Sequence, residues 1–165
     1  MIYLLCDTNH SCKEIQKEIS IKIEEIINSN QNKHIVFFTE LFRPNEDIDD
    51  IFLNKFRESA EGKEYFEILN VLKKKKYDCN NEKIKIFGIL PQLDYFLLGY
   101  HKPFYDNFEK AFKKYTKLCP NPVSIIHIGD AHRDYFINEF NKNKIIDYCC
   151  YVFEKDLLGV SISLL

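Results

Sequence analysis

Short apolar runs alternate with longer amphipathic segments along the chain, and this alternation limits the fold more than any other feature. The runs are rich in Ile, Val and Phe, which is typical of strands buried on both faces of a sheet. Polar or turn-forming residues follow most of them. The predicted strands are residues 2–6, 34–38, 84–89, 123–128 and 145–153.

The segments between these runs predict helices that pack on the sheet. Residues 61–76 and 104–117 carry apolar side chains at helical spacing, and further helices are expected after the first and fourth runs. Ser11 and Glu14 form a capping box at the start of the first helix. Strands that alternate with helices indicate an α/β fold, with a mainly parallel sheet and helices on both faces. We expect residues 1–165 to form a single domain of this kind.

Two segments fall outside the alternation. The acidic stretch from Glu46 to Asp50 is expected to be a loop or a frayed helix start. The apolar tail, residues 157–165, is expected to pair as an edge strand or to lie at an interface. An interface would make the protein a homo-oligomer or give it an assembly partner.

The composition excludes several classes of protein. Of the 165 residues, 45% are apolar and 29% charged, which is too apolar for a disordered chain, and the apolar runs are too short to span a membrane. Lys and Arg total 23 against 25 Asp and Glu, so the formal net charge of −2 supplies no field that attracts nucleic acid or an anionic membrane. We therefore expect neither nucleic acid nor a membrane as a partner.

Cysteine usage and the first residues indicate a reducing compartment. The six cysteines include no C-x-x-C pair and lack the spacing of a secreted disulfide framework. Residues 1–5 read as a strand and not as a secretory signal. We expect a cytoplasmic protein. The abundance of Ile, Lys and Asn suggests an AT-rich genome such as that of a large DNA virus, for which the location would be the host cytoplasm or the virion.

Polar side chains follow the predicted strands at the point where each strand ends. In an open parallel sheet, ligands bind in the crevice beyond the carboxyl ends of the strands, so these side chains should share one edge. We expect a small-molecule or peptide substrate there. The residues are Asp7 and His10 after the first strand, Glu40 and Arg43 after the second, Asp94 after the third, and Asp130, His132 and Arg133 after the fourth.

Three of these residues carry the predicted chemistry. His10 and His132 lie near helix starts, where the positive end of the helix favours a neutral imidazole. Glu40 between them could act as general base, proton donor or metal ligand, and a His/His/carboxylate set suits Zn, Mn or Fe. We therefore predict His10, Glu40 and His132 as catalytic residues and as the ligands of a divalent metal.

The other polar residues have supporting or structural assignments. Arg43 or Arg133 is predicted to orient an anionic or carbonyl group of the substrate, and Asp94 and Asp130 to contribute to substrate binding. The remaining histidines have no required role: those at 34 and 127 are assigned to packing, and the one at 101 could approach the site. Cys6 is interpreted as a small buried hydrophobe, with nucleophile chemistry left open.

The order of these motifs resembles the ChaN-like, erythromycin-esterase-like and TIKI/TraB-type superfamily. Its pattern is a strand leading to G-x-x-H, a glutamate after the next strand and a second G-x-x-H after a late strand. The segment "IHIGDAH" carries the second motif as Gly129 and His132, and "VFFTE" supplies Glu40. The segment "YLLCDTNH" matches the first motif with His10, but Asp7 stands where glycine is usual.

The resemblance covers about residues 1–140 and extends to Gly88 and Asp94, which match a glycine-aspartate element of those domains. It implies a site but not one reaction, because some members hydrolyse esters through His and Glu, some are metal-dependent proteases and some bind haem. Asp7 replaces a glycine that permits close approach of the backbone, so this departure argues against full activity of the kind found in the superfamily.

Two other enzyme classes match parts of the same segments. Residues 130–134, D-A-H-R-D, resemble an element of arginase-type binuclear metal enzymes, whose other motifs are absent. A metallophosphoesterase would use Asp7 and His10 with residues 129–130, but the later Gly-Asn-His is missing. Both rank below the first resemblance. A hydrolase and a catalytically silent relative that acts as a structural or interaction protein, such as a viral component, remain open.

Overall fold

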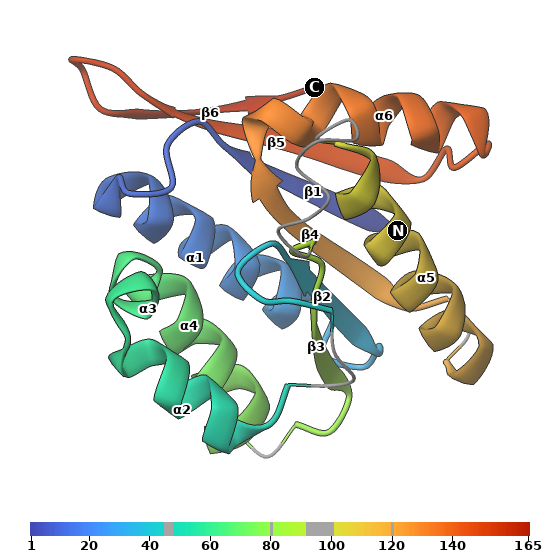
Figure 1. The fold of residues 1–165 in the computed structure, drawn as a ribbon, viewed down its shortest axis with the longest axis horizontal. Helices are drawn as coiled ribbons and strands as arrows, with labels where there is room; N and C mark the ends of the chain where they lie inside the picture. Colours follow the sequence, from blue (N-terminus) through green and yellow to red (C-terminus); the bar gives the residue numbers. More distant parts are fainter. Residues whose placement is uncertain (45–47, 80, 92–100, 120) are drawn as a thin grey trace.

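A computed structural model describes residues 1–44, 48–79, 81–91, 101–119 and 121–165. Its described strands form one six-stranded sheet in the order β3-β2-β4-β1-β5-β6 (Figure 1). All neighbouring strands are parallel except β5 and β6, which pair antiparallel. The strands are β1 (Ile2–Asp7), β2 (Ile35–Thr39), β3 (Ile84–Gly88), β4 (Val123–Gly129), β5 (Tyr148–Lys155) and β6 (Val160–Leu164).

Helices cover both faces of the sheet (Figure 1). On one face lie α1 (Lys13–Ser29), α2 (Asp50–Glu58), α3 (Ala60–Glu64) and α4 (Phe66–Lys73), and α4 continues into a π-helical turn, η1 (Lys74–Asp78). On the other face lie α5 (Lys102–Leu118) and α6 (Arg133–Lys142), and α6 follows a short 3-10 turn, η3 (Asp130–His132). The predicted α/β class with a mainly parallel sheet is confirmed.

Each face of the sheet has its own apolar core, because successive side chains of a strand point to opposite faces. In β1, Leu5 packs towards α1 and α4, whereas Leu4 and Cys6 pack towards α5 and α6. The second core is dominated by aromatic rings, including Phe108 and Phe136, whose centroids lie 5.7 Å apart. Asp7, two residues after Leu5, belongs to the α1 face and ends its strand there.

The order of the strands creates a crevice at the carboxyl ends of β1, β4 and β2. The segments after β1 and β2 pass to the α1 face, whereas α6, which follows β4, lies on the opposite face. In the sheet, β4 lies between β1 and β2. The segment that follows β4 and the segments that follow its two neighbours therefore leave the sheet on opposite faces. Such points are where open α/β sheets bind ligands.

Several local predictions differ from the structure. The helix predicted at 61–76 is divided into α3, α4 and η1, with Tyr65 as the residue between the first two. The N-cap of α1 is Cys12, which makes no side-chain capping bond, so the predicted capping box of Ser11 and Glu14 does not form. Glu14 instead pairs with Lys155 at 2.8 Å.

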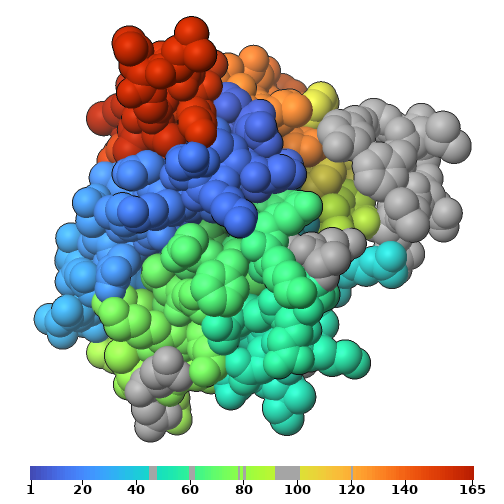
Figure 2. All heavy atoms as spheres, turned by 90° about the vertical axis from the view of Figure 1, so that its left-hand side faces the viewer, coloured from blue at the N-terminus to red at the C-terminus, as the bar shows by residue number. Residues whose placement is uncertain are grey.

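The apolar tail forms β6, the edge strand that was one of its two predicted states. The turn of the β5–β6 hairpin extends beyond the sheet (Figures 1 and 2). Leu157 and Leu158 in this turn are fully exposed. None of the helices in the described ranges is both long and apolar enough to cross a membrane.

Candidate functional site

Asp7 lies at the centre of a polar network beneath the crevice. Its side chain is fully buried, and its Oδ2 lies 2.8 Å from His127 Nε2. Its Oδ1 lies 2.7 Å from His10 Nδ1, and the two side chains form an ion pair. Asp7 thus joins two histidines.

The register of the sheet explains why His127 reaches Asp7. Asp7 is opposite Gly129 and Thr39 is opposite His127, so all three side chains point to the α1 face at the ends of their strands. His127 is fully buried and its Nδ1 lies 3.3 Å from Thr39 Oγ1. Its assignment to packing alone is therefore incomplete, because both ring nitrogens have polar partners.

His10 lies between two carboxylates. Its Nε2 is 3.0 Å from Glu40 Oε1, on the side opposite Asp7. Hydrogen bonds to Asp7 and Glu40 raise the pKa of His10 to about 10, against the opposing effect of partial burial. The prediction of a neutral imidazole is wrong for His10, because two carboxylates outweigh the nearby helix end.

Burial opposes ionisation of Asp7, yet its pKa lies well below the ordinary range. Hydrogen bonds and charge interactions with His127 and His10 outweigh the cost of burial. The side-chain Nε2 of Gln16, which points to the same carboxylate from α1, lies 3.4 Å from Asp7 Oδ2 and also donates to the carbonyl oxygen of His10 at 3.0 Å. Asp7 is thus an ionised buried group.

Glu40 is oriented by the chain at the end of β4. Its Oε1 accepts a hydrogen bond of 2.7 Å from the backbone N–H of Gly129, and the residue is only 8% exposed. A Cβ at position 129 would lie 2.8 Å from His10 Nε2, closer than two such atoms can approach. A side chain at this position would therefore displace the His10 ring from its contact with Glu40.

His132 approaches the other oxygen of Glu40. Its Nε2 lies 3.8 Å from Glu40 Oε2, beyond direct hydrogen bonding but within range of electrostatic interaction. The ring packs on Phe104 at 4.1 Å between centroids, and its Nδ1 lies 3.0 Å from His101 Nδ1. Burial lowers the pKa of His132, which favours the neutral ring predicted for this residue.

The structure thus brings His10, Glu40 and His132 together, whereas the predicted substrate-binding residues contribute less. Arg133 pairs with Asp130 at 2.8 Å and with Asp134 at 3.0 Å, both on its own segment. Arg43 is exposed after β2, and no described contact joins it to Glu40. Position 94, where an aspartate was predicted to bind substrate, lies outside the described residues.

His10, Glu40 and His132 were predicted to bind a metal. Their side chains contact one another and do not point towards a common position that an ion could occupy. His10 Nε2 is directed to Glu40 Oε1, and the same oxygen accepts the Gly129 N–H. Within the described ranges, no group of three or more His, Cys, Asp or Glu side chains is arranged to hold a metal ion. We therefore derive no chemical step through a metal at this site.

Reasoning from sequence did not assign His127, Thr39 or Gln16 to the site. One signal was available for His127, because it lies two residues before Gly129 on the strand that carries the second G-x-x-H motif, and so shares a face with the end of that strand. Gln16 could not be found in this way, since its role depends on how α1 packs.

Comparison with family models, curated proteins and solved structures found no match for this chain.

Proposed function

We propose that this protein is a hydrolase whose reacting groups are Glu40, His10 and His132. The observation that carries the proposal is that the two histidines approach opposite oxygens of one buried carboxylate, at 3.0 and 3.8 Å. The three residues lie at the divergence point of the sheet, where ligands of α/β proteins bind. Their order along the chain is also that of the superfamily described above, which includes esterases.

The different charge states of the histidines suggest a division of roles. Glu40 accepts a proton from a water molecule as the water oxygen attacks the carbonyl carbon of an ester or amide. His132, neutral because it is buried, lies beside Glu40 Oε2 and takes up this proton from Glu40. It then passes the proton to the leaving group as the bond between that group and the carbonyl carbon breaks, so that both residues return to their starting states. His10, protonated between Asp7 and Glu40, holds the Glu40 carboxylate in place.

Hydrolysis of a panel of p-nitrophenyl esters and short peptides tests this proposal. We expect Glu40→Gln, His10→Ala and His132→Ala each to lower kcat/KM by about 100-fold or more, the usual contribution of a positioned acid or base. His34→Ala is the matched control, because His34 is exposed at the opposite end of β2. A wild-type protein inactive on the whole panel, or folded variants with wild-type rates, would contradict the proposal.

Elemental analysis of the purified protein separates a metal-dependent reaction from a metal-free one. Stoichiometric Zn, Mn or Fe that is lost in both His10→Ala and His132→Ala would make the site a metal centre. Activity that persists in metal-free protein, after dialysis against a chelator, is the result expected from the proposed roles of Glu40 and His132.

The exposed hairpin favours a second candidate, a structural or interaction protein. Leu157 and Leu158 are fully exposed at the β5–β6 turn, and Leu164 and Leu165 are more than 60% exposed near the chain end. Exposed apolar patches of this kind commonly mark interfaces. Sedimentation equilibrium tests the assembly: a wild-type oligomer that becomes monomeric in a Leu157→Ser/Leu158→Ser variant would support this function, and a wild-type monomer would contradict it.

A further inference from the structure

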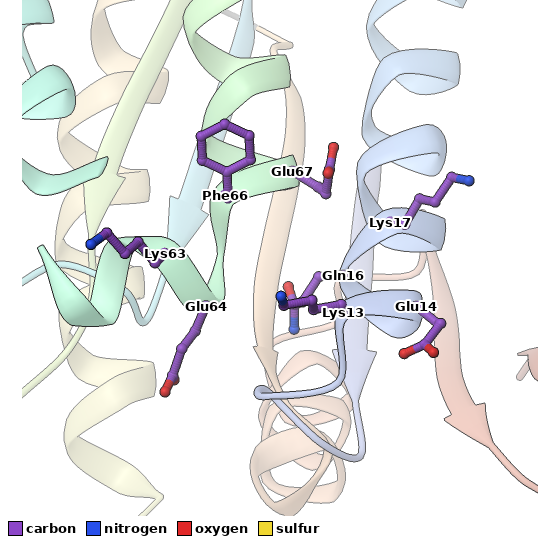
Figure 3. Close-up of a pocket in the computed structure, with 8 residues that line it drawn as sticks. All are labelled: Lys13, Glu14, Gln16, Lys17, Lys63, Glu64, Phe66 and Glu67. Carbon is purple, nitrogen blue, oxygen red and sulfur yellow. The ribbon is translucent and has the colours of Figure 1, made fainter. Parts of the chain in front are cut away.

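A separate cavity of about 450 Å³ opens between the first turn of α1 and the segment that joins α3 to α4 (Figure 3). On the surface, α1 and the α3–α4 segment lie next to each other on one face of the molecule (Figure 2). The volume is within the range of roughly 300–1,000 Å³ that small-molecule sites occupy. The lining residues are Lys13, Glu14, Gln16, Lys17, Lys63, Glu64, Phe66 and Glu67.

Gln16 supplies a buried hydrogen-bond acceptor to this cavity. It is only 1% exposed, and its Nε2 donates to the carbonyl oxygen of His10 and approaches Asp7 Oδ2. Both of these atoms accept hydrogen bonds only, so the orientation of the amide is fixed and Oε1 is the remaining atom. Oε1 has no hydrogen-bond partner among the described residues, and a buried acceptor in this state is unfavourable unless a ligand donates to it.

The α1 wall of the cavity is basic. Lys13 and Lys17 line it, and in Figure 3 the ammonium group of Lys13 extends towards the α3–α4 segment whereas that of Lys17 extends away from it. The charge of Glu14 is offset by its ion pair with Lys155 at 2.8 Å. The helix also begins here, with an N-cap residue, Cys12, whose side chain caps no backbone N–H. A helix start adds positive potential, so this wall favours a carboxylate.

The opposite wall is acidic and partly apolar. Glu64 and Glu67 line it, while Lys63, from the same segment, extends away from α1 in Figure 3. Phe66 is 44% exposed and adds an aromatic surface. This wall therefore favours an ammonium group next to an apolar side chain.

The walls do not neutralise each other. At the other end of the same pair of helices, Lys75 Nζ lies 2.8 Å from Glu24 Oε1, so the charges there are paired across the helices. At the cavity, no ion pair within the described part of the chain joins the basic wall, Lys13 and Lys17, to the acidic wall, Glu64 and Glu67. The opposite charges are held apart by an open space.

We propose that this cavity binds a small zwitterion with an apolar side chain, such as a free amino acid or a dipeptide. The ligand carboxylate meets the basic wall, and the ammonium group meets the acidic wall and donates to Gln16 Oε1. The apolar side chain packs on Phe66. This binding goes beyond the proposed hydrolysis and does not depend on it, since none of His10, Glu40 and His132 lines the cavity.

NMR titration of the wild-type protein with L-phenylalanine, L-leucine and L-leucyl-L-phenylalanine tests the site. We expect shifts of backbone amides in the first turn of α1 and in the α3–α4 segment, and of the Gln16 side-chain NH2. N-acetyl-L-phenylalanine and L-phenylalaninamide, which lack one charge each, should bind up to about fivefold more weakly than L-phenylalanine, as the loss of one partly exposed ion pair predicts. No shift with any of the three zwitterions at about 10 mM would overturn the proposal, because that concentration detects millimolar Kd values.

Charge-reversed variants test which wall meets which group. Lys13→Glu should weaken binding of N-acetyl-L-phenylalanine more than that of L-phenylalaninamide, and Glu67→Lys should do the reverse. The matched controls are Lys33→Glu and Glu25→Lys, exposed residues outside the cavity, which should leave both affinities unchanged. Equal effects of the cavity and control variants would overturn the site, whatever the outcome of the hydrolysis assays. Circular dichroism confirms that each variant is folded.

Discussion

His127 Nε2 and Asp7 Oδ2 lie 2.8 Å apart between the two central strands, and both side chains are fully buried. The same carboxylate contacts His10 through its other oxygen. The network therefore links the interior of the sheet to the crevice, and Asp7 governs both the stability of the fold and the charge of His10. Each of these consequences is open to measurement.

Asp7→Asn should lower the free energy of unfolding by about 3–5 kcal/mol, the usual cost of removing one partner from a buried ion pair. It should also lower the pKa of His10, because one of the two carboxylates that raise it is lost. Urea denaturation and NMR titration of the His10 ring measure the two effects. Asp106→Asn, which removes an exposed ion pair with Lys102, is the control and should change stability by less than about 1 kcal/mol.

The contribution of His10 to stability should depend on pH. Its folded-state pKa of about 10 is above its ordinary value of 6.5, so the stabilisation is fully present below pH 6.5 and is lost as the pH rises through 10. Because the side chain is 39% exposed, we expect about 2 kcal/mol, less than half of what the shift alone would give. Urea denaturation of wild type and His10→Gln across this range measures it. A constant difference between the two proteins would show that His10 is not protonated.

Phe136→Ala should destabilise the second core by about 3–5 kcal/mol, because a fully buried ring that contacts Tyr105, Phe108 and Phe140 is replaced by a cavity. Thermal or chemical unfolding measures the loss. Leu118→Ala removes a side chain that is 74% exposed and should change stability by less than about 0.5 kcal/mol. Similar losses in both variants would contradict the placement of Phe136.

Alkylation should distinguish the cysteines. Cys6 is fully buried, and a hydrogen bond with Cys150 together with burial raises its pKa well above the ordinary value, so its reactive thiolate is scarce. Cys79 is exposed. Mass spectrometry after brief treatment with iodoacetamide should find Cys79 modified and Cys6 unmodified in the native protein, and both modified in urea. Rapid native labelling of Cys6 would indicate that β1 is accessible.

The sequence was sufficient to predict the strands. It was also sufficient to predict that His10, Glu40 and His132 lie close together, because parallel strands place their carboxyl ends at one edge of the sheet. It was not sufficient for the charge of His10, which depends on the short distances to Asp7 and Glu40. Strand alternation assigns a side chain such as His127 to a face but does not name its partner across the sheet.

The spacing of apolar residues also did not predict where the helices begin and end. Residues 61–76 keep apolar side chains at helical spacing, yet the chain turns at Tyr65, whose ring lies 5.9 Å from that of His10 and 6.2 Å from that of His127. This break separates α3 from α4 at the border of the cavity. Periodicity records which side chains are buried, and it does not record where a helix bends to reach a distant ring.

The middle of the sheet is supplied by a late part of the chain. In total, 122 of the 165 residues precede β4. Until Val123–Gly129 inserts between β1 and β2, Asp7 lacks His127 and Glu40 lacks the Gly129 amide. During synthesis on the ribosome, the crevice can therefore be completed only after most of the polypeptide has emerged, and a nascent chain that stalls before this strand would carry Asp7 and Glu40 without the partners that β4 supplies.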